Sequence, residues 1–563
     1  MAGERTRLWL PAVRRALAGQ ASAEWRASPM GRAALAGPRP DGFAAQPHNL
    51  RPAHRERGEA ILQGRFDLAG ETLDLGPGGD PWNRPSPSLA FAERLHGFDW
   101  VVDLLIHGEA GAREALRLTL DWKRVFGRWN AFSWRADLAE RRVFNLACAG
   151  KAMLAGASDF EIGLLSDSLA RQTRLLLRLK DEPPRAAERL NAAALAGLAL
   201  GGPAGEALYA KAAPRLDQAL AKAIAPDGGH LTRSPEAGLE LLLDLLALDD
   251  GLSQVGRAPL ERVTRAIDRL TGALRFFTLP DGRLGAFQGG EPSEPARIAA
   301  ALASETPAAK AEPQKDAPFS GYQRLNSAEM NILLDAAAPA AGAWSLSACD
   351  QVGAIEVVCG RERLIANCGW SPRSHRAGPW RQTDAASTVT LGEAPRPEPL
   401  TGYLAEALGP QLVGAPDQVT HHRRENEAGA WVEVSHTGWL AATGLTHERR
   451  LFLDKALSEL RGEDRFIPAE GARPQSVPVA IRFHLPPEVS ALVSRDQRSV
   501  LLRGASGKGW WLRSDASEVT IDPSATFREG VAYKASQIVL RGRLRADRGG
   551  RVRWKLAVAE GAA

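Results

Sequence analysis

Residues 225–237 read Ala-Pro-Asp-Gly-Gly-His-Leu-Thr-Arg-Ser-Pro-Glu-Ala, and a leucine-rich segment follows at 239–248. Asp-Gly-Gly favours a turn, because glycine adopts positive φ without a Cβ clash. Ser234 and Pro235 are typical of a helix start, with serine as the N-cap and proline in the first turn. Glu236 then lies where the helix dipole favours an anion. The following helix is apolar on nearly every side, so the stretch predicts a polar loop held by a buried helix, as in many active sites.

Helical periodicity extends on both sides of this stretch, and strand-like alternation is absent between about residues 90 and 275. The expected helices are 91–105, 113–126, 137–148, 160–180, 188–200, 204–223, 235–248 and 259–277. The breaks between them are short and contain Gly, Pro or Asp. Consecutive antiparallel helices without heptads predict an α/α toroid, an incomplete barrel of helical hairpins. Residues before it predict a short helix, an irregular extension and a hairpin around 66–75.

The periodicity changes to two after a segment rich in Pro, Ala, Glu and Ser at 289–318. The expected strands are 321–325, 330–335, 354–359, 364–368, 387–391, 431–436, 446–453, 457–467, 479–485, 499–502, 509–513, 536–543 and 551–558. This spacing is typical of a large antiparallel β-sandwich. The sequence therefore predicts a multidomain chain, α then β. Its expected parts are an N-terminal extension (1–60), a toroid (61–288), a linker (289–318) and a β-sandwich (319–563).

The composition excludes several classes of protein. The 563 residues are 44% hydrophobic and 24% charged, with 71 Lys and Arg against 66 Asp and Glu, which fits a soluble globular chain. No nucleic-acid-binding motif and no apolar run of about 20 residues is present, so neither nucleic acid nor a membrane span is expected. Residues 1–19 resemble an amphipathic helix more than a signal peptide, which makes the cytoplasm the default location. The four cysteines form no Cys-x-x-Cys pair and are expected to be buried thiols, not a zinc site.

A set of short motifs resembles the heparinase II/III family of polysaccharide lyases over most of the chain. The motifs are 80–87 (Asp-Pro-Trp-Asn-Arg-Pro-Ser-Pro), 94–100 (Arg-Leu-His-Gly-Phe-Asp-Trp), 127–130 (Gly-Arg-Trp-Asn), 225–237, 320–325 (Ser-Gly-Tyr-Gln-Arg-Leu), 367–369 (Asn-Cys-Gly), 462–465 (Gly-Glu-Asp-Arg) and 482–485 (Arg-Phe-His-Leu). The resemblance implies a helical toroid followed by a β-sandwich. It also implies cleavage of acidic polysaccharides by β-elimination. That reaction needs donors that neutralise a uronate carboxylate, a base for the C5 proton, and an acid for the leaving oxygen.

The chain departs from the catalytic pattern of the family at each expected place. Residues 185–188 read Arg-Ala-Ala-Glu where relatives have an Asn-His pair, and no tyrosine follows Ser234-Pro235. Family histidines are also absent from 348–353 and 385–388, and Asn367 takes the place of a zinc-binding aspartate. We therefore expect no cofactor, and the structural zinc of some relatives is not supported here.

The remaining candidates are residues whose chemistry suits an acidic glycan. The catalytic candidates are His230, Glu236 and His447, and the substrate-binding candidates are His96, Trp100, Arg128, Trp129, Asn191, Arg233, Arg449 and His484. Arginine suits carboxylate or sulfate because its planar fork binds both, and tryptophan stacks on sugar rings. Each also has a purely structural alternative: a turn or core histidine, a salt-bridged arginine, or a tryptophan that fills the toroid.

Three functions stay open at this point. The first is a polysaccharide lyase, or a relative with a rearranged catalytic set, acting on uronate-containing glycans. The second is a non-catalytic glycan-binding or cell-envelope assembly protein on the lyase scaffold, and family resemblance would then favour the envelope or periplasm over the cytoplasm. The third is a hydrolase with a carboxylate pair such as Glu236 and Glu463, which must lie roughly 5 to 9.5 Å apart. The partner expected in the first two cases is an acidic polysaccharide, and the sequence sets no oligomeric state.

Overall fold

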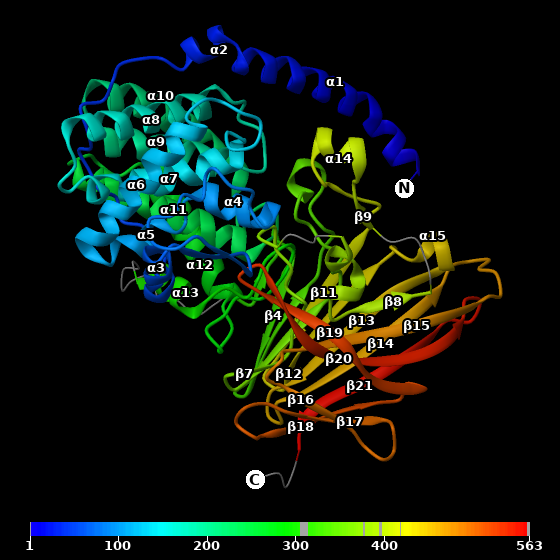
Figure 1. The fold of residues 1–563 in the computed structure, drawn as a ribbon. Coiled ribbons are helices and arrows are strands. Elements are labelled where there is room, and N and C mark those ends of the chain that lie inside the picture. Colours follow the sequence, from blue (N-terminus) through cyan, green and yellow to red (C-terminus); the bar gives the residue numbers. More distant parts are fainter. Residues whose placement is uncertain (1, 304–313, 375–377, 393–396, 417, 560–563) are drawn as a thin grey trace.

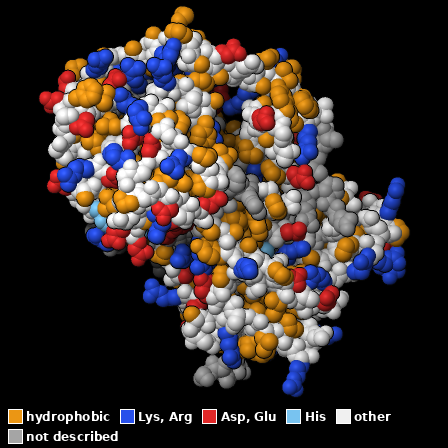
Figure 2. Space-filling view, viewed as in Figure 1, with side chains coloured by type: hydrophobic (Ala, Val, Ile, Leu, Met, Phe, Trp, Pro, Cys, Tyr) orange, Lys and Arg blue, Asp and Glu red, His pale blue; other side chains and the backbone are white. Residues whose placement is uncertain are grey.

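The computed structural model describes residues 2–303, 314–374, 378–392, 397–416 and 418–559. Helices fill the first half of the chain and antiparallel strands the second half, and the two halves lie side by side (Figure 1 and, with all side chains drawn, Figure 2). We call α3–α13 the helical part and β3–β21 the strand part. This is the predicted order, a helical toroid followed by a sheet-rich region. No described helix is long and apolar enough to cross a membrane.

The helical part consists of helices that pack mainly against their neighbours in the chain. They are α3 (Arg55–Leu62), α4 (Leu89–Gly97), α5 (Val101–Leu105), α6 (Gly108–Phe126), α7 (Ala136–Met153), α8 (Asp159–Arg178), α9 (Ala186–Leu200), α10 (Gly202–Ala223), α11 (Pro235–Gln254), α12 (Glu261–Phe277) and α13 (Pro295–Ala303), with a hairpin of β1 (Arg65–Leu68) and β2 (Glu71–Asp74) after α3. Every residue of α9 is buried, and α9 contacts α7, α8, α10 and α11. Its many alanines allow these helices to approach closely, so α9 lies at the centre of this part.

Several helices begin at a side-chain cap that the sequence suggests. Ser234 caps α11 by accepting a hydrogen bond from the Ala237 N–H, which confirms the predicted start at Ser234-Pro235. Ser158 and Glu161 form a reciprocal capping box at the start of α8. These caps satisfy backbone donors that have no partner inside the helix.

The N-terminal segment differs from the short helix that the sequence predicts. Helix α1 (Ala2–Ala27) has 26 residues and is followed by α2 (Pro29–Ala34). α1 extends across the molecule to α14 (Gly402–Leu408) in the strand part (Figure 1). Ala12 packs there with Leu400 and Leu404, and the Trp9 ring stacks on Tyr403 at 5.6 Å. The helix is longer than predicted, and the region around Ala12 packs on a segment almost 400 residues away in the sequence.

Antiparallel strands form the sheets of the strand part, within the described residues. The first sheet is β3 (Asp316–Ala317), β4 (Tyr322–Asn326), β5 (Met330–Asp335), β6 (Ile355–Cys359) and β7 (Glu362–Ile365). The hairpin sheet has the order β19 (Glu518–Arg528), β20 (Val531–Arg545), β15 (Ser476–Leu485) and β8 (Val389–Leu391). The outer sheet has the order β11 (Val419–Glu425), β12 (Gly429–His436), β13 (Leu445–Asp454), β14 (Glu459–Pro468), β21 (Gly550–Val558), β18 (Gly509–Ser514), β17 (Ser499–Arg503) and β16 (Ser490–Val493). Inward side chains of all three sheets share one apolar core.

Several strands escaped the sequence prediction, and the longest of them are β11 and β19. β11 reads Val-Thr-His-His-Arg-Arg-Glu and is an edge strand, polar on both faces, so it lacks an apolar period of two. β19 contains Pro523 and mostly polar residues, and it is held by pairing with β20 from Glu518–Arg541 to Arg528–Val531. In both cases the partner strand, and not the local sequence, fixes the conformation.

The helical and strand parts are joined by apolar and polar contacts. The helical core continues into the strand part through Tyr322, Leu333 and Val358. Arg324 of β4 donates hydrogen bonds to the carbonyls of Arg275, Phe276 and Thr278 at the end of α12. A cation at a helix C-terminus is favourable because it donates to carbonyls that have no partner within the helix and interacts with the negative end of the helix dipole. The candidate site described below lies at this junction.

Candidate functional site

The loop at 225–237 connects α10 to α11 and also fastens the helical part to the strand part. The Asp227 carboxylate accepts hydrogen bonds from the backbone N–H groups of Phe319 and Ser320 at 2.8 and 2.7 Å, and from the Ser320 hydroxyl at 2.7 Å. Gly228 and Gly229 allow this approach, because a Cβ on Gly229 would lie 1.9 Å from Ser320 Oγ. The Asp-Gly-Gly turn that the sequence shows therefore serves the junction between the two parts.

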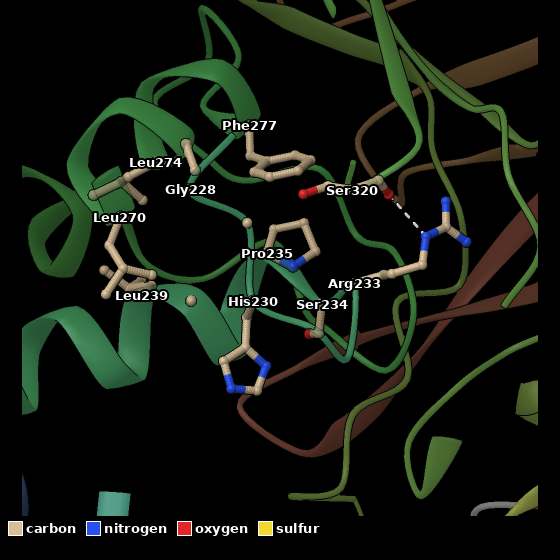
Figure 3. A pocket seen from close by; sticks show the side chains of 13 residues that line it. Gly228, His230, Arg233, Ser234, Pro235, Leu239, Leu270, Leu274, Phe277 and Ser320 are labelled. Carbon is tan, nitrogen blue, oxygen red and sulfur yellow. Dashed lines mark hydrogen bonds between the residues drawn. The ribbon is translucent and has the colours of Figure 1, made fainter. Parts of the chain in front are cut away.

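Arg233 was predicted to bind substrate, and the structure directs its whole guanidinium into the strand part. It donates to the carbonyls of Ser320 and Ala338, each at 2.8 Å, and to the Asp335 carboxylate at 2.5 Å. Its charge lies 4.8 Å from the centre of the Tyr322 ring, whose hydroxyl donates back to the Arg233 carbonyl at 2.7 Å. Figure 3 shows the Arg233 and His230 side chains pointing in different directions from the loop. Arg233 is buried, and its guanidinium donors are all hydrogen-bonded within the protein, so none is left for a ligand.

His230 is the predicted catalytic residue whose surroundings are best defined. The Thr232 hydroxyl accepts from the Ser234 N–H at 3.3 Å, and it lies 2.8 Å from His230 Nδ1. The Thr232 N–H also donates to Nδ1, at 3.3 Å. Nδ1 is therefore an acceptor, and in the neutral ring the proton resides on Nε2. Burial, followed by the charge of Arg185, lowers the pKa of His230 to about 3, so the ring is neutral at physiological pH.

The free edge of His230 faces a buried carboxylate that the sequence analysis did not select. His230 Nε2 has no hydrogen-bond partner among the described residues and lies 3.9 Å from Glu188 Oε1. Glu188 Oε2 is likewise without a partner, and burial raises the pKa of Glu188. The Trp344 ring meets His230 edge to face at 5.8 Å. A recess of about 10 Å³ lies between the loop and helices α11 and α12, and neither Glu188 nor Trp344 lines it. That volume is about the space of one water molecule.

The arginines around this pair are engaged by carboxylates of the helical part. Arg185 binds Glu140 through two hydrogen bonds of 2.7 and 3.0 Å. Arg141 binds both oxygens of Asp244, at 2.5 and 3.0 Å, and Arg51 binds the same carboxylate at 2.7 Å. Asp244 is an acid inside the leucine-rich helix α11, and such a buried charge needs partners. That requirement is the signal by which the sequence could have revealed this network.

Asn191, a predicted binding residue, belongs to the same region. It is fully buried on α9, and its amide donates to the Asp244 carbonyl at 2.9 Å. Its Oδ1 has no partner among the described residues. Asn191 lies one helical turn after Glu188, so α9 presents two polar side chains on one face of an otherwise apolar helix.

Glu236 is held in a second polar cluster between the two parts. Its carboxylate pairs with Arg373 of the strand part and accepts a hydrogen bond from the Glu291 N–H at 3.0 Å. The Glu291 carboxylate accepts from the Ser371 hydroxyl and from the Gly530 N–H, both at 2.8 Å. Burial raises the pKa of Glu236 to about 7, against the opposing effect of Arg373 and with help from Glu291. Glu236 therefore lies in the contact between the parts, although the sequence places it beside His230.

The other candidates of the helical part divide between core and surface. Trp100 is fully buried and donates from Nε1 to the Leu95 carbonyl at 2.9 Å. His96 accepts from Trp122 Nε1 at 3.0 Å, and burial lowers the pKa of His96 to about 3. Arg128 is exposed and Trp129 half-buried on the loop after α6. Trp100 and His96 therefore fill the core, whereas Arg128 and Trp129 are accessible to a ligand.

The strand-part candidates lie in buried networks of their own. His447 bridges His436 at 3.1 Å and the Asp464 carboxylate at 2.9 Å, and Arg449 donates to Asp464 at 2.8 Å. Trp554 completes this cluster by donating to Asp464 at 2.9 Å. The chain as described contains no hydrogen bond or ion pair between His447 and the 225–237 loop. The predicted grouping of His447 with His230 and Glu236 is therefore not found, because strand alternation turns His447 into the sheet core.

Two further expectations concern His484 and the carboxylate pair. The His484 ring contacts the Ser524 hydroxyl at 2.7 Å and the Asp384 carbonyl at 3.0 Å, and burial lowers the pKa of His484 to about 4. Glu463 lies on the outer sheet and pairs with Arg553 at 3.1 Å, whereas Glu236 lies at the junction. These two carboxylates therefore lie in different places and do not face one substrate.

Metal ligands do not gather in the part of the chain that the structure describes. No group of three or more His, Cys, Asp or Glu residues there is arranged to hold an ion. The four cysteines are buried and unpaired.

Comparison with known proteins agrees with this architecture. A family model described as "Heparinase II/III-like, C-terminal" matches residues 309–555. FtsZ-localized protein C of Caulobacter vibrioides is 48% identical over 561 residues, which cover 98% of this chain and 96% of that protein.

Solved structures of lyases have the same fold at low sequence identity. Heparinase III matches with a TM-score of 0.70 at 14% identity, over 92% of this chain and 88% of that one. A mutant of the heparan sulfate lyase HepC from Pedobacter heparinus matches with 0.58 at 15% identity, over 94% and 88%. The chondroitin AC lyase of Streptomyces coelicolor A3 matches with 0.54 at 12% identity, over 94% and 82%. The chain therefore belongs to the heparinase II/III-like family.

Proposed function

We propose that this chain works without lyase chemistry, as a glycan-binding or assembly protein that occupies the same cellular positions as FtsZ. The observation that carries the proposal is the state of His230. The nitrogen that faces Glu188, Nε2, carries the proton, because Nδ1 already accepts from the Thr232 N–H. A general base needs a free lone pair and a pKa near the working pH, and the pKa of His230 is lowered to about 3.

The space around His230 supports the same proposal. His230 Nε2 and Glu188 Oε2 are both shielded from solvent, so a sugar ring has no open approach to either atom. The family tyrosine that would follow Pro235 is absent, and the hydroxyl of the nearby Tyr322 is occupied by the Arg233 carbonyl. Proton removal and proton delivery therefore both lack a suitable group at this loop.

The arginines that surround His230 and Glu188, in the region that we call the cup, give a third line of support. A uronate or sulfate binds best to a guanidinium that has free donors. Arg141 and Arg185 each give two hydrogen bonds to a carboxylate of this chain, Asp244 and Glu140 respectively. Binding of an anionic sugar in the cup would have to break these buried pairs, which is costly.

The cellular position in the proposal comes from a relative. FtsZ-localized protein C is, by its name, localised with FtsZ, and it aligns with this chain at 48% identity over nearly its whole length. An acidic polysaccharide stays the proposed partner because the scaffold is that of polysaccharide lyases.

Fluorescence imaging in cells tests the proposal. We expect a fluorescent fusion of the full chain to coincide with labelled FtsZ, and we expect Glu188→Gln to coincide equally well, because the role needs no acid–base chemistry. A fusion distributed independently of FtsZ would overturn the proposed position. Loss of coincidence in Glu188→Gln, with the protein folded and present at the same level, would overturn the non-catalytic role.

A lyase with a rearranged catalytic set is the second candidate, and one observation favours it. Glu188 Oε2 and His230 Nε2 are buried polar atoms that find no partner within the described ranges, and such atoms often mark functional sites. In this case His230 would donate to the substrate carboxylate and Glu188 would remove the C5 proton. The ultraviolet absorbance of the unsaturated product decides between the candidates, since only the lyase produces it.

A further inference from the structure

We propose that the exposed face of the outer sheet is a binding site for an anionic polysaccharide, separate from the cup beside His230. The face carries a groove of about 520 Å³. Inward residues of the same strands, such as Val432, Leu451 and Leu556, belong to the apolar core. Their neighbours in the sequence must therefore point to solvent, since side chains alternate along a strand.

A row of six side chains crosses this face from strand to strand. Register places Arg424 opposite Trp431, Trp431 opposite Phe452, Phe452 opposite Arg461, Arg461 opposite Lys555, and Lys555 opposite Arg513. We call these six residues the cationic row. Neighbouring strands lie about 4.8 Å apart, so the row extends roughly 24 Å across the sheet. It contains four cations and two aromatic rings, and no carboxylate.

Like charges directly opposite each other destabilise a sheet, and this row has two such pairs in succession. Arg461 and Lys555 share one carboxylate, Glu459, at 2.6 and 2.8 Å. Arg424 and Arg513, at the two ends, form no ion pair with any residue that the structure describes. The row therefore presents more positive charge than the protein itself neutralises, and a bound polyanion would supply the missing charge.

The adjacent row shows what a purely structural arrangement looks like on the same strands. Glu433, Arg450, Glu463 and Arg553 lie opposite one another in that order, so their charges alternate. Arg450 pairs with Glu433 at 2.7 Å, and Arg553 pairs with Glu463 at 3.1 Å. This alternating row needs no external partner. The contrast between the two rows argues for a ligand on the cationic row.

The two aromatic side chains lie next to each other toward the Arg424 end of the cationic row. The Trp431 and Phe452 rings stack at 4.4 Å, and the Arg461 guanidinium lies 5.6 Å from the centre of the Phe452 ring. Trp431 keeps 39% of its surface exposed. An exposed indole beside fixed cations suits a sugar that has an apolar C–H face and a negative group.

The exposed Trp431 indole favours a polysaccharide over an acidic peptide. A polyuronate offers an apolar C–H face for the indole as well as a carboxylate for the neighbouring cations. An acidic peptide offers the carboxylates but no such face. This inference takes its class of ligand, an acidic polysaccharide, from the function proposed above, and it depends on that proposal for nothing else.

Calorimetric titration with a hexamer of galacturonic acid tests the site. We expect the full chain to bind the hexamer and to release it as salt is raised, because salt screens exposed charges. The double variant Arg513→Ala/Lys555→Ala should bind at least about fivefold more weakly. The matched control is Arg543→Ala/Arg545→Ala, which removes the same charge from exposed positions of β20 in the hairpin sheet and should bind like the unmodified chain.

Four results would overturn the site: no binding of the hexamer, equal weakening by both double variants, no weakening by either, or equally tight binding of a hexaglutamate peptide. The last result would show that charge alone is recognised. The titration is independent of FtsZ, so its failure is distinguishable from failure of the proposed cellular position. Imaging of the Arg513→Ala/Lys555→Ala fusion then shows whether that position depends on the glycan.

Discussion

The guanidinium of Arg233 and the carboxylate of Asp335 form a buried ion pair of 2.5 Å between the start of α11 and the end of β5. Asp335 also accepts from Gln288 Nε2 at 2.7 Å, so one carboxylate ties together the loop before α11, the segment after α12 and the first sheet. The stretch that looks in the sequence like a catalytic loop therefore holds the two parts of the molecule together.

Replacing Asp335 by asparagine should strongly destabilise the protein. The side chain of Asp335 is fully buried, and the substitution leaves the Arg233 charge without a counter-ion. Breaking a buried pair in this way costs about 3 to 5 kcal/mol. The midpoint of urea unfolding measures the loss.

Glu206→Gln is the matched control for this variant. It removes a carboxylate from the exposed pair of Glu206 with Arg257, which contributes at most about 1 kcal/mol. Equal unfolding midpoints for Asp335→Asn and Glu206→Gln would show that the Arg233 contact does not hold the parts together.

Gly462 should tolerate no side chain, because the Trp554 ring packs directly on it. A Cβ at this position would lie 2.1 Å from two atoms of the indole. We expect Gly462→Ala to reduce the free energy of unfolding by about 1 to 3 kcal/mol, as overpacking does.

The control for Gly462→Ala is Gly272→Ala in α12, where a Cβ would meet nothing within 4 Å. This change should stabilise the helix by roughly 0.5 to 1 kcal/mol, because alanine loses less backbone entropy than glycine. Thermal unfolding of the two variants should therefore shift in opposite directions, and a shift in the same direction contradicts the packing described for Trp554.

Buried neutral histidines should make the protein less stable in acid. The pKa of His230 is lowered to about 3, below its ordinary value near 6.5, so between these values the unfolded chain binds more protons than the folded chain. Unfolding free energy must then rise with pH from about 3 to 6.5. His230→Gln should make this rise less steep, as measured by chemical unfolding at several pH values.

Glu236 contributes to the pH dependence of stability in the opposite direction, and the same experiment measures it. Its pKa is raised to about 7, so the folded chain holds the proton more tightly than the unfolded chain between about 4.5 and 7. Glu236→Gln should therefore make the rise of stability with pH steeper. The same change of slope in both variants would contradict the environments described for the two groups.

The sequence predicted the order of helices and strands because apolar periodicity changes sharply after residue 318. It also predicted the start of α11, since Ser234 and Pro235 determine a helix N-terminus locally. β11 and β19 were missed because their pairing partners, and not their own residues, make them strands. α1 was predicted too short, and its contact around Ala12 is made with residues 400–413, which the local sequence does not reveal.

The candidate site was harder to predict than the fold. His230 could be selected from its loop, but Glu188 could not, because its neighbourhood comes from α10, α11 and Trp344 together. Arg233 and Arg449 resemble ligand-binding arginines in the sequence, and only the structure reveals Asp335 and Asp464 as their buried partners. Partner choice among charged residues depends on tertiary contacts, which the local pattern does not contain.

The ultraviolet absorbance of the β-elimination product tests the central claim most directly. The full chain is incubated with a panel of uronate-containing polymers, and Glu188→Gln is measured in parallel. The account predicts no absorbance from either protein on any polymer, because His230 Nε2 carries a proton and is shielded from solvent. Absorbance from the unmodified chain that disappears in Glu188→Gln would contradict the account and establish a lyase.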